Sequence, residues 1–227
     1  SLPPGGPVPV VSHEDHTPGQ GQYADPAAME RWLVAGEGMS ADEAATHVEW
    51  WRASRDEHLD RRDDTLAWLG GLATDQRIVL FGHDPETGED VAALAARGGR
   101  VAEFPTTLVA ARAAHEQDLL VVAGAPNVIR GGSHAGNVSA AELVAAGLVD
   151  ALATDYLPSA LLPAALRLVR EGLATLPRAV GLVSSGPAAC VGLADRGALR
   201  PGQRADLVLA ELDAPLPRVL SVLTSTS

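Results

Sequence analysis

The side chains that could carry chemistry stand at or near the ends of short apolar runs. They are His13, Glu14, Asp15, His16, His83, Asp84, Glu103, Asn127 and Asp155. Imidazole and carboxylate groups together suit a divalent metal ion such as Zn²⁺, Mn²⁺ or Fe²⁺. A bound metal ion lowers the pKa of its water, and a nearby carboxylate can carry the proton to a leaving group. The residue types therefore indicate metal-assisted hydrolysis.

Each of these residues also has a structural interpretation. A single histidine such as His83 is more often hydrogen-bonded within a protein than bound to a metal, and Glu103 could be a buried, paired carboxylate. Asp155 could cap the turn after its strand, because aspartate favours such positions. Asp15 and His16 could each be a metal ligand or an anchor of their loop.

Short strands alternate with helices along the middle of the chain. The apolar runs predict five strands, at residues 8–12, 78–81, 101–104, 119–123 and 151–154. Capping boxes and glycine stops predict helices over 40–69, 89–97, 108–116, 140–146 and 159–170. This alternation favours an α/β fold with a parallel sheet. Because the carboxyl ends of parallel strands share one edge, the ionisable residues are expected to meet there.

A loop rich in glycine and asparagine is predicted between the fourth strand and the following helix. Its glycines allow backbone N–H groups to face a phosphate, and the guanidinium of Arg130 can bind two phosphate oxygens at once. A surface turn is the alternative, because a Gly-Gly pair is not specific to phosphate sites. The loop is therefore an anion-binding candidate.

Composition narrows the functions further. The 227 residues are enough for one sizeable domain or two small ones, and the net charge of −12 argues against nucleic-acid binding. All seventeen basic residues are arginine. The lack of lysine excludes Schiff-base chemistry, a Walker-type phosphate loop and a metal pair bridged by a carboxylated lysine from this chain.

The sequence also bears on the compartment. No apolar run approaches the roughly 18 residues that span a membrane, and the start lacks the pattern of a signal peptide. The single cysteine, Cys190, excludes an internal disulfide and fits a reducing compartment. These features, with the acidic net charge, predict a cytoplasmic protein with no membrane or nucleic-acid partner.

Several motifs, in this order, resemble those of the PhnM-like members of the amidohydrolase superfamily. They are Asp-His-Thr-Pro-Gly-Gln at 15–20, Gly-His-Asp at 82–84, Ala-Glu-Phe-Pro-Thr-Thr at 102–107, Gly-Ala-Pro-Asn-Val-Ile-Arg-Gly-Gly-Ser-His-Ala-Gly-Asn-Val-Ser at 124–139, Thr-Asp-Tyr at 154–156, and Asp-Arg-Gly at 195–197 with Arg-Ala-Asp-Leu-Val at 204–208. The resemblance covers nearly the whole chain and corresponds to the C-terminal part of the family pattern.

The resemblance implies a metal-dependent hydrolase of phosphonate catabolism, in the carbon–phosphorus lyase pathway. Such enzymes release pyrophosphate from α-D-ribose 1-methylphosphonate 5-triphosphate. Asp155 corresponds to the catalytic aspartate and would be the general acid and base. The implied metal ligands are His83, Asp15, His16 and Glu103, and the implied phosphate contacts are Asn127, Arg130, Ser133 and His134. Many amidohydrolases carry a histidine on the strand of Glu103, whereas the PhnM-like form carries glutamate.

The implied fold is a (β/α)₈ barrel within residues 1–174, with a small β-sandwich formed partly by residues 175–227. A barrel of this kind needs eight strands, so the chain is expected to lack the N-terminal ones. Three explanations stay open: a fragment, a truncated member, or a homo-oligomer in which another copy completes the sheet. Two other functions also stay open, a non-catalytic amidohydrolase-like subunit and an amidohydrolase acting on an amide.

Overall fold

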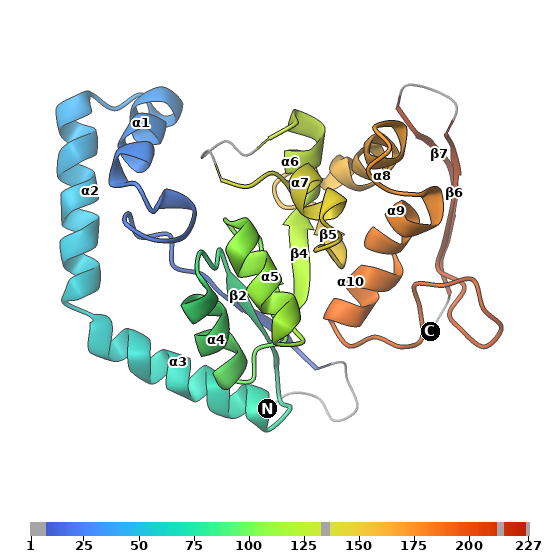
Figure 1. The fold of residues 1–227 in the computed structure, drawn as a ribbon, viewed down its shortest axis with the longest axis horizontal. Coiled ribbons are helices and arrows are strands. Elements are labelled where there is room, and N and C mark those ends of the chain that lie inside the picture. The colour runs from blue at the N-terminus through green and yellow to red at the C-terminus, as the bar shows by residue number, and fades with distance from the viewer. Residues whose placement is uncertain (1–7, 133–136, 213–215, 226–227) are drawn as a thin grey trace. The chain divides into compact units, whose positions relative to one another are not determined.

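A computed structural model describes residues 8–132, 137–212 and 216–225 (Figure 1). The chain divides into two compact units, residues 1–117 and 118–227. Parallel strands alternate with helices in both, so the predicted α/β class is confirmed. The predicted division between residues 174 and 175 stays a prediction. None of the helices described is both long and apolar enough to cross a membrane.

Three parallel strands form the centre of the first unit. They lie in the order β1 (Val10–His13), β2 (Val79–His83) and β3 (Val101–Glu103). Helices α4 (Gly88–Ala96) and α5 (Leu108–Glu116) follow β2 and β3 and pack against each other. The register places His13 beside Gly82 and His83 beside Glu103, so the ends of these strands stand at one edge.

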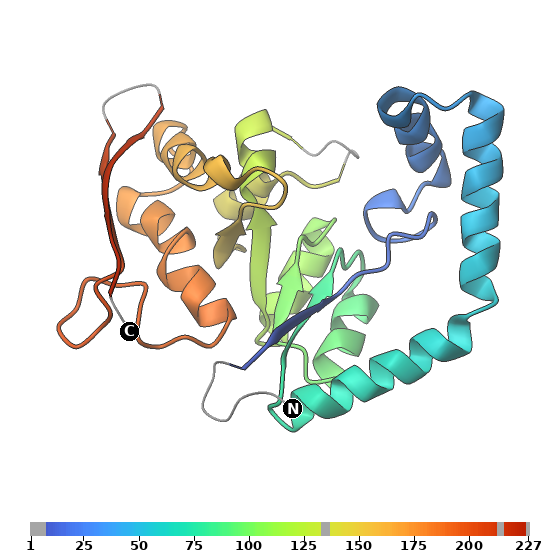
Figure 2. The same cartoon turned by 180° about the vertical axis from the view of Figure 1, so that it is seen from behind.

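A helical arm connects β1 to β2, and Figure 2 shows it leaving the end of β1 and returning to the start of β2. It consists of η1 (Gly21–Tyr23), α1 (Pro26–Glu37), α2 (Ala41–Asp56) and α3 (Leu59–Thr74). The arm has an apolar core of its own, made of Tyr23, Met29, Leu33, Ala44 and Val48. This core holds η1, α1 and α2 together.

The single helix expected over residues 40–69 is wrong, because α2 and α3 are separate. The capping box of Ser40 and Glu43 starts α2 as predicted. Helix α2 ends at Asp56, and Nδ1 of His58 lies 2.7 Å from the carbonyl oxygen of Ser54 in its last turn, to which it can donate. Helix α3 then continues past the predicted stop, because Gly70 allows it to pack closely on Arg97, where a Cβ would lie 3.3 Å from the Arg97 Cβ.

The second unit begins with another parallel pair, β4 (Leu120–Gly124) and β5 (Ala151–Ala153). Its helical elements are α6 (Ala125–Arg130), α7 (Ala140–Ala145), η2 (Pro158–Ala160), α8 (Leu161–Arg170), α9 (Leu176–Leu182) and α10 (Ser185–Cys190). The loop predicted after β4 is wrong over α6. Pro126 suits the first turn of a helix, and Gly131 ends it with a φ of +82°.

The C-terminal strands β6 (Leu207–Glu211) and β7 (Arg218–Leu223) form an antiparallel pair. Both sides of the pair expose apolar residues, which include Val208, Leu209, Val219, Val222 and Leu223. An isolated two-stranded ribbon is only marginally stable in water. The β-sandwich expected here stays a prediction.

Candidate metal centre

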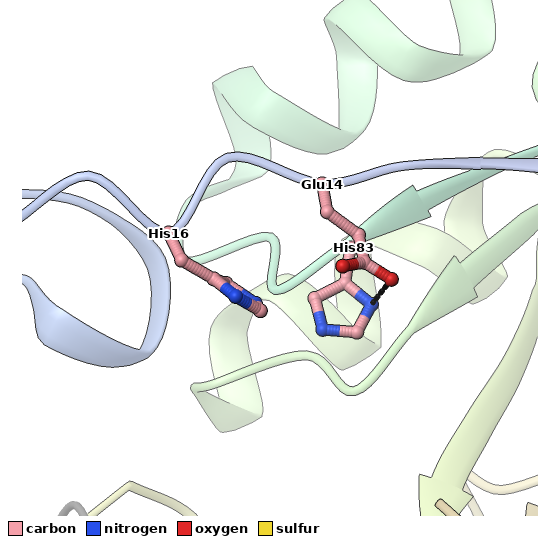
Figure 3. A group of neighbouring side chains, drawn as sticks. All are labelled: Glu14, His16 and His83. Carbon is pink, nitrogen blue, oxygen red and sulfur yellow. Dashed lines mark ion pairs between the residues drawn. The ribbon is translucent and has the colours of Figure 1, made fainter.

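Glu14, His16 and His83 form a group that could hold a metal ion. Each offers one ligand atom, and these atoms lie within 4.8 Å of one another. Figure 3 shows Glu14 and His16, both from the segment after β1, approaching His83. His83 is the last residue of β2, which pairs in parallel with β1. The parallel pairing thus brings together residues that are about 70 positions apart in sequence.

Two neighbours fix the orientation of the His83 ring. Its Nδ1 lies 2.9 Å from Oε2 of Glu103, and the ring stands edge-on to Phe104 with centroids 5.2 Å apart. When Nδ1–H donates to the carboxylate, the lone pair of the neutral ring is on Nε2 and can bind a metal ion. A carboxylate that orients a metal-binding histidine in this way is a common arrangement in metal sites.

Glu103 connects all three strands of the first unit. Its Oε2 accepts a hydrogen bond from Oγ of Ser12 on β1 at 2.6 Å as well as the one from His83 on β2. The side chain of Glu103 is 17% exposed and that of His83 is 11% exposed. The bond therefore lies in a partly desolvated environment, where charge-assisted hydrogen bonds are strong.

Asp84 lies close to both imidazoles, which also stand edge-on to each other with ring centroids 5.1 Å apart. Its Oδ2 is 3.5 Å from Nε2 of His16, and its Oδ1 is 3.7 Å from Nε2 of His83. Nε2 of His16 and Oδ2 of Asp84 are buried, and neither atom has a hydrogen-bond partner among the residues that the structure describes. Burying such groups without a partner costs about 1–3 kcal/mol each, and a cation between them would use both lone pairs. This nitrogen and oxygen donor set fits Zn²⁺, Mn²⁺ or Fe²⁺.

The protonation of the His83–Glu103 pair reflects these contacts. Burial alone would lower the pKa of His83, but the hydrogen bond to Glu103 and the negative charges of Asp84, Glu103 and Glu14 raise it. Burial would raise the pKa of Glu103, but the hydrogen bonds from His83 and Ser12 and the charge of His83 lower it. Both shifts widen the pH range over which an imidazolium faces a carboxylate in the absence of metal.

Asp15 makes a different set of contacts. Its Oδ1 accepts hydrogen bonds from the backbone N–H of Thr17 at 3.1 Å and from Oγ1 of Thr17 at 2.7 Å. Its Oδ2 lies 3.5 Å from Nε of Arg62. Burial would raise the pKa of Asp15, but hydrogen bonds from Thr17 and Gln20 and the charge of Arg62 lower it. The carboxylate thus anchors its own loop.

Two residues after these strands adopt a left-handed backbone. Asp84, directly after β2, has a φ of +51°, and Phe104, directly after β3, has a φ of +52°. Such conformations are uncommon for residues other than glycine and cluster at functional sites. At this edge they turn the Asp84 carboxylate toward the two histidines and the Phe104 ring toward His83.

The remaining predicted residues belong to the second unit. Asp155 is exposed after β5 with a φ of +50°. Nη1 of Arg130 lies 3.3 Å from the hydroxyl of Tyr156, which it can donate to, and Oδ1 of Asn127 accepts a hydrogen bond from the N–H of Ala140 at 2.9 Å. Ser133 and His134 lie outside the described residues.

Sequence reasoning found part of this centre. The ligand roles of His83, Asp15, His16 and Glu103 all stay predictions. The structure brings His16 and His83 together and sets Glu103 behind His83, whereas Asp15 turns to Thr17 and Arg62. It adds Glu14 and Asp84. Both had a signal in the sequence, because each stands beside a histidine within three residues after the end of a predicted strand.

Comparisons with known proteins place these observations in context. No family model matches the chain. Over 206 residues it is 38% identical to the alpha-D-ribose 1-methylphosphonate 5-triphosphate diphosphatase of Escherichia coli strain K12. This match confirms the resemblance. It covers 90% of this chain and 54% of that protein, so the chain spans about half the length of the curated relative.

Two solved structures are also similar to the chain. One is the crystal structure of an uncharacterized protein, with a TM-score of 0.50, 18% identity, and coverage of 72% of this chain and 50% of that one. The other is L-hydantoinase (dihydropyrimidinase) from Arthrobacter aurescens, with a TM-score of 0.40, 18% identity, and coverage of 69% and 41%. At this identity the first likeness concerns the fold alone.

Proposed function

We propose that the chain belongs to the PhnM-like diphosphatases of the amidohydrolase superfamily. Its reaction would be the metal-dependent hydrolysis of α-D-ribose 1-methylphosphonate 5-triphosphate, which releases pyrophosphate and leaves the 5-phosphate. The observation that carries this proposal is the 38% identity, over 90% of the chain, to a diphosphatase named for that substrate. The donor set of the first unit supports it, because hydrolysis of a phosphoanhydride is well served by a divalent metal ion.

His16, His83, Asp84 and Glu14 would hold the ion. When bound, it would supply Lewis-acid stabilisation of the phosphate charge and a water of lowered pKa. Glu103 would keep the His83 ring in place by accepting its Nδ1–H. We propose no ligand role for Asp15, because its two oxygens already face Thr17 and Arg62.

Asp155 would act as the general acid and base. Its carboxylate would accept a proton from the attacking water and return it to the oxygen of the departing pyrophosphate. Its exposure leaves the carboxylate free to meet a substrate. We base this role on the correspondence of Thr-Asp-Tyr at 154–156 to the family motif.

The polyphosphate would be held by Arg130, Asn127, Ser133 and His134. The planar guanidinium of Arg130 can donate two parallel hydrogen bonds to phosphate oxygens. Oδ1 of Asn127 is used by the N–H of Ala140, so its amide NH₂ would be the group that donates to an anion.

We further propose that β1 to β5 are successive strands of a (β/α)₈ barrel and that β6 and β7 belong to a small β-sandwich. The strand–helix order supports the first part, as does the position of the metal centre at the carboxyl ends of β1 and β2. The apolar faces of the β6–β7 pair support the second, because such a ribbon needs a covering partner.

The test combines metal content with pyrophosphate release. Wild type purified with metal supplied is expected to retain roughly one or two divalent ions, as its nitrogen and oxygen donors suggest, and His83→Ala to lose them. Wild type is expected to release pyrophosphate from the triphosphate, and Asp155→Asn to release far less. The exposed Glu116→Gln is the matched control for charge. A metal-free wild type, or an Asp155→Asn variant as active as wild type, would contradict the proposal.

A further inference from the structure

The segment that carries Glu14 and His16 has no regular secondary structure, so side chains must hold it in place. Asp15 stands between the two ligand candidates. Its carboxylate fixes the turn to Thr17 through two hydrogen bonds. Its backbone carbonyl accepts a further hydrogen bond from Nε2 of Gln20 at 3.0 Å. The positions of both ligand candidates therefore depend on the residue between them.

The helical arm contacts this segment at two points. Nε of Arg62, in the first turns of α3, lies 3.5 Å from Oδ2 of Asp15. Nη1 of Arg55, in the last turn of α2, donates to Oε1 of Gln20 at 3.3 Å. Both arginines come from the junction between the two helices. The arm thus reaches the metal-binding segment through Asp15 and Gln20.

We propose that Arg62 is a positioning residue of the metal centre. By holding Asp15, it would fix the backbone between Glu14 and His16 and so preserve the spacing of their ligand atoms. This inference rests on the metal site of the proposed function. Arg62 acts one contact further from the ion than a residue that hydrogen-bonds a ligand directly, so its effect on metal affinity is expected to be smaller than that of such a partner.

The sign of the effect separates positioning from simple electrostatics. Arg62 is a cation near a cation site, so its charge alone would weaken metal binding, and its removal would strengthen it. Positioning predicts the opposite, because a loosened segment no longer presents Glu14 and His16 together. The ion pair itself is 40% exposed on the arginine side and is expected to add little to overall stability.

The experiment is a titration of the metal-free chain with Co²⁺. Calorimetry measures the binding affinity, and visible absorption reports the coordination of the bound ion. Arg62→Ala is expected to bind up to about fivefold more weakly, because an exposed ion pair contributes at most about 1 kcal/mol, and to show an altered spectrum. Arg61→Ala, which removes the same charge from an exposed neighbour on α3, is expected to bind at least as tightly as wild type. Arg62→Lys, which keeps the charge, is expected to recover part of the affinity.

Two further variants make the result decisive. If Arg62 acts through Asp15, adding Arg62→Ala to Asp15→Asn will cause little further loss of affinity. Independent, additive losses would overturn the inference, and so would an Arg62→Ala variant that binds Co²⁺ like Arg61→Ala. If wild type and His83→Ala both fail to bind Co²⁺, the metal site of the proposed function fails instead. Circular dichroism of each variant verifies that it is folded.

Discussion

Replacing Glu103 with glutamine tests how the metal centre is assembled. The substitution keeps the shape of the side chain and an oxygen that can accept from His83 and Ser12, but it removes the negative charge. A hydrogen bond to a charged group contributes about 1.5–3 kcal/mol and a neutral one about 0.5–1.5 kcal/mol. We therefore expect the His83 contact, now 2.9 Å long, to lose about 1–1.5 kcal/mol, which is about tenfold in an equilibrium constant.

Two measurements can detect the weaker contact of His83 in Glu103→Gln. In the metal-free protein, NMR titration of the imidazole protons is expected to show a lower pKa for His83 in Glu103→Gln than in wild type. Calorimetric titration with Zn²⁺ is expected to show affinity reduced about 10–100-fold, because the ring is less firmly held and its nitrogen is less basic. Glu116→Gln serves as the control for the loss of one carboxylate from the same unit.

The pH dependence of stability provides an independent check. Because the pKa of His83 is raised in the folded protein, protonated His83 stabilises the fold fully at pH values below 6.5, the ordinary histidine pKa. This contribution is lost as the pH rises through the raised pKa. The lowered pKa of Glu103 stabilises the fold above its ordinary value of 4.5, and this contribution is lost as pH falls through the lowered pKa. The stability difference between metal-free wild type and Glu103→Gln should therefore be largest between 4.5 and 6.5.

The results also decide between two roles for Glu103. If Glu103→Gln removes metal binding as completely as His83→Ala does, the carboxylate is itself a ligand, as the sequence motifs suggest. An intermediate loss supports the orienting role seen in the structure. Unchanged metal affinity together with an unchanged His83 pKa would refute the reasoning, because the carboxylate would then contribute to neither state.

Three further predictions concern the first unit. Asp15→Asn should destabilise the metal-free protein by about 1 kcal/mol at neutral pH. Because the pKa of Asp15 is lowered, its contribution is present above the ordinary value of 3.8, and urea unfolding should show the difference vanish as pH falls through the lowered value. Gly82→Ala should cost about 1–3 kcal/mol, since the new Cβ would lie 2.6 Å from Leu94. Gly71→Ala should stabilise α3 by up to about 1 kcal/mol, because its Cβ would meet no described atom within 4 Å apart from the adjacent residues and the backbone of its own helix. Equal unfolding midpoints would contradict both expectations. Chelation should lower the unfolding temperature of metal-loaded wild type by an amount equivalent to about 2.7 kcal/mol at a metal concentration 100 times Kd, and should leave His83→Ala unaffected.

Helices and strands could be predicted from the sequence where capping residues and the hydrophobic pattern agree. Capping boxes start α2 and α7 as predicted, and each expected strand overlaps an observed one. Helix α1 gave no clear signal, because it follows a segment rich in glycine and glutamine. The break between α2 and α3 escaped prediction since no proline or glycine marks it. It depends on His58 reaching a carbonyl of the preceding turn, which is a contact and not a pattern.

The candidate site shows the same limit at the level of side chains. Parallel strands predict which residues reach one edge, and on that basis His16 and His83 were expected to meet. Which carboxylates face the histidines depends on the local backbone and side-chain conformation. Asp84 turns toward the histidines through a left-handed backbone, whereas Asp15 turns back toward Thr17 and Arg62. The sequence alone does not tell which of two adjacent acidic residues, such as Glu14 and Asp15, faces the histidines.

Several negative charges gather around His83. Glu14, Asp84 and Glu103 all approach His83, in a chain whose net charge is already −12. Such a concentration of negative charge repels an anionic substrate and attracts a cation. In the metal-free state the raised pKa of His83 offsets part of this repulsion with a proton. A divalent cation would supply more positive charge than that proton, so the arrangement favours the binding of a metal ion.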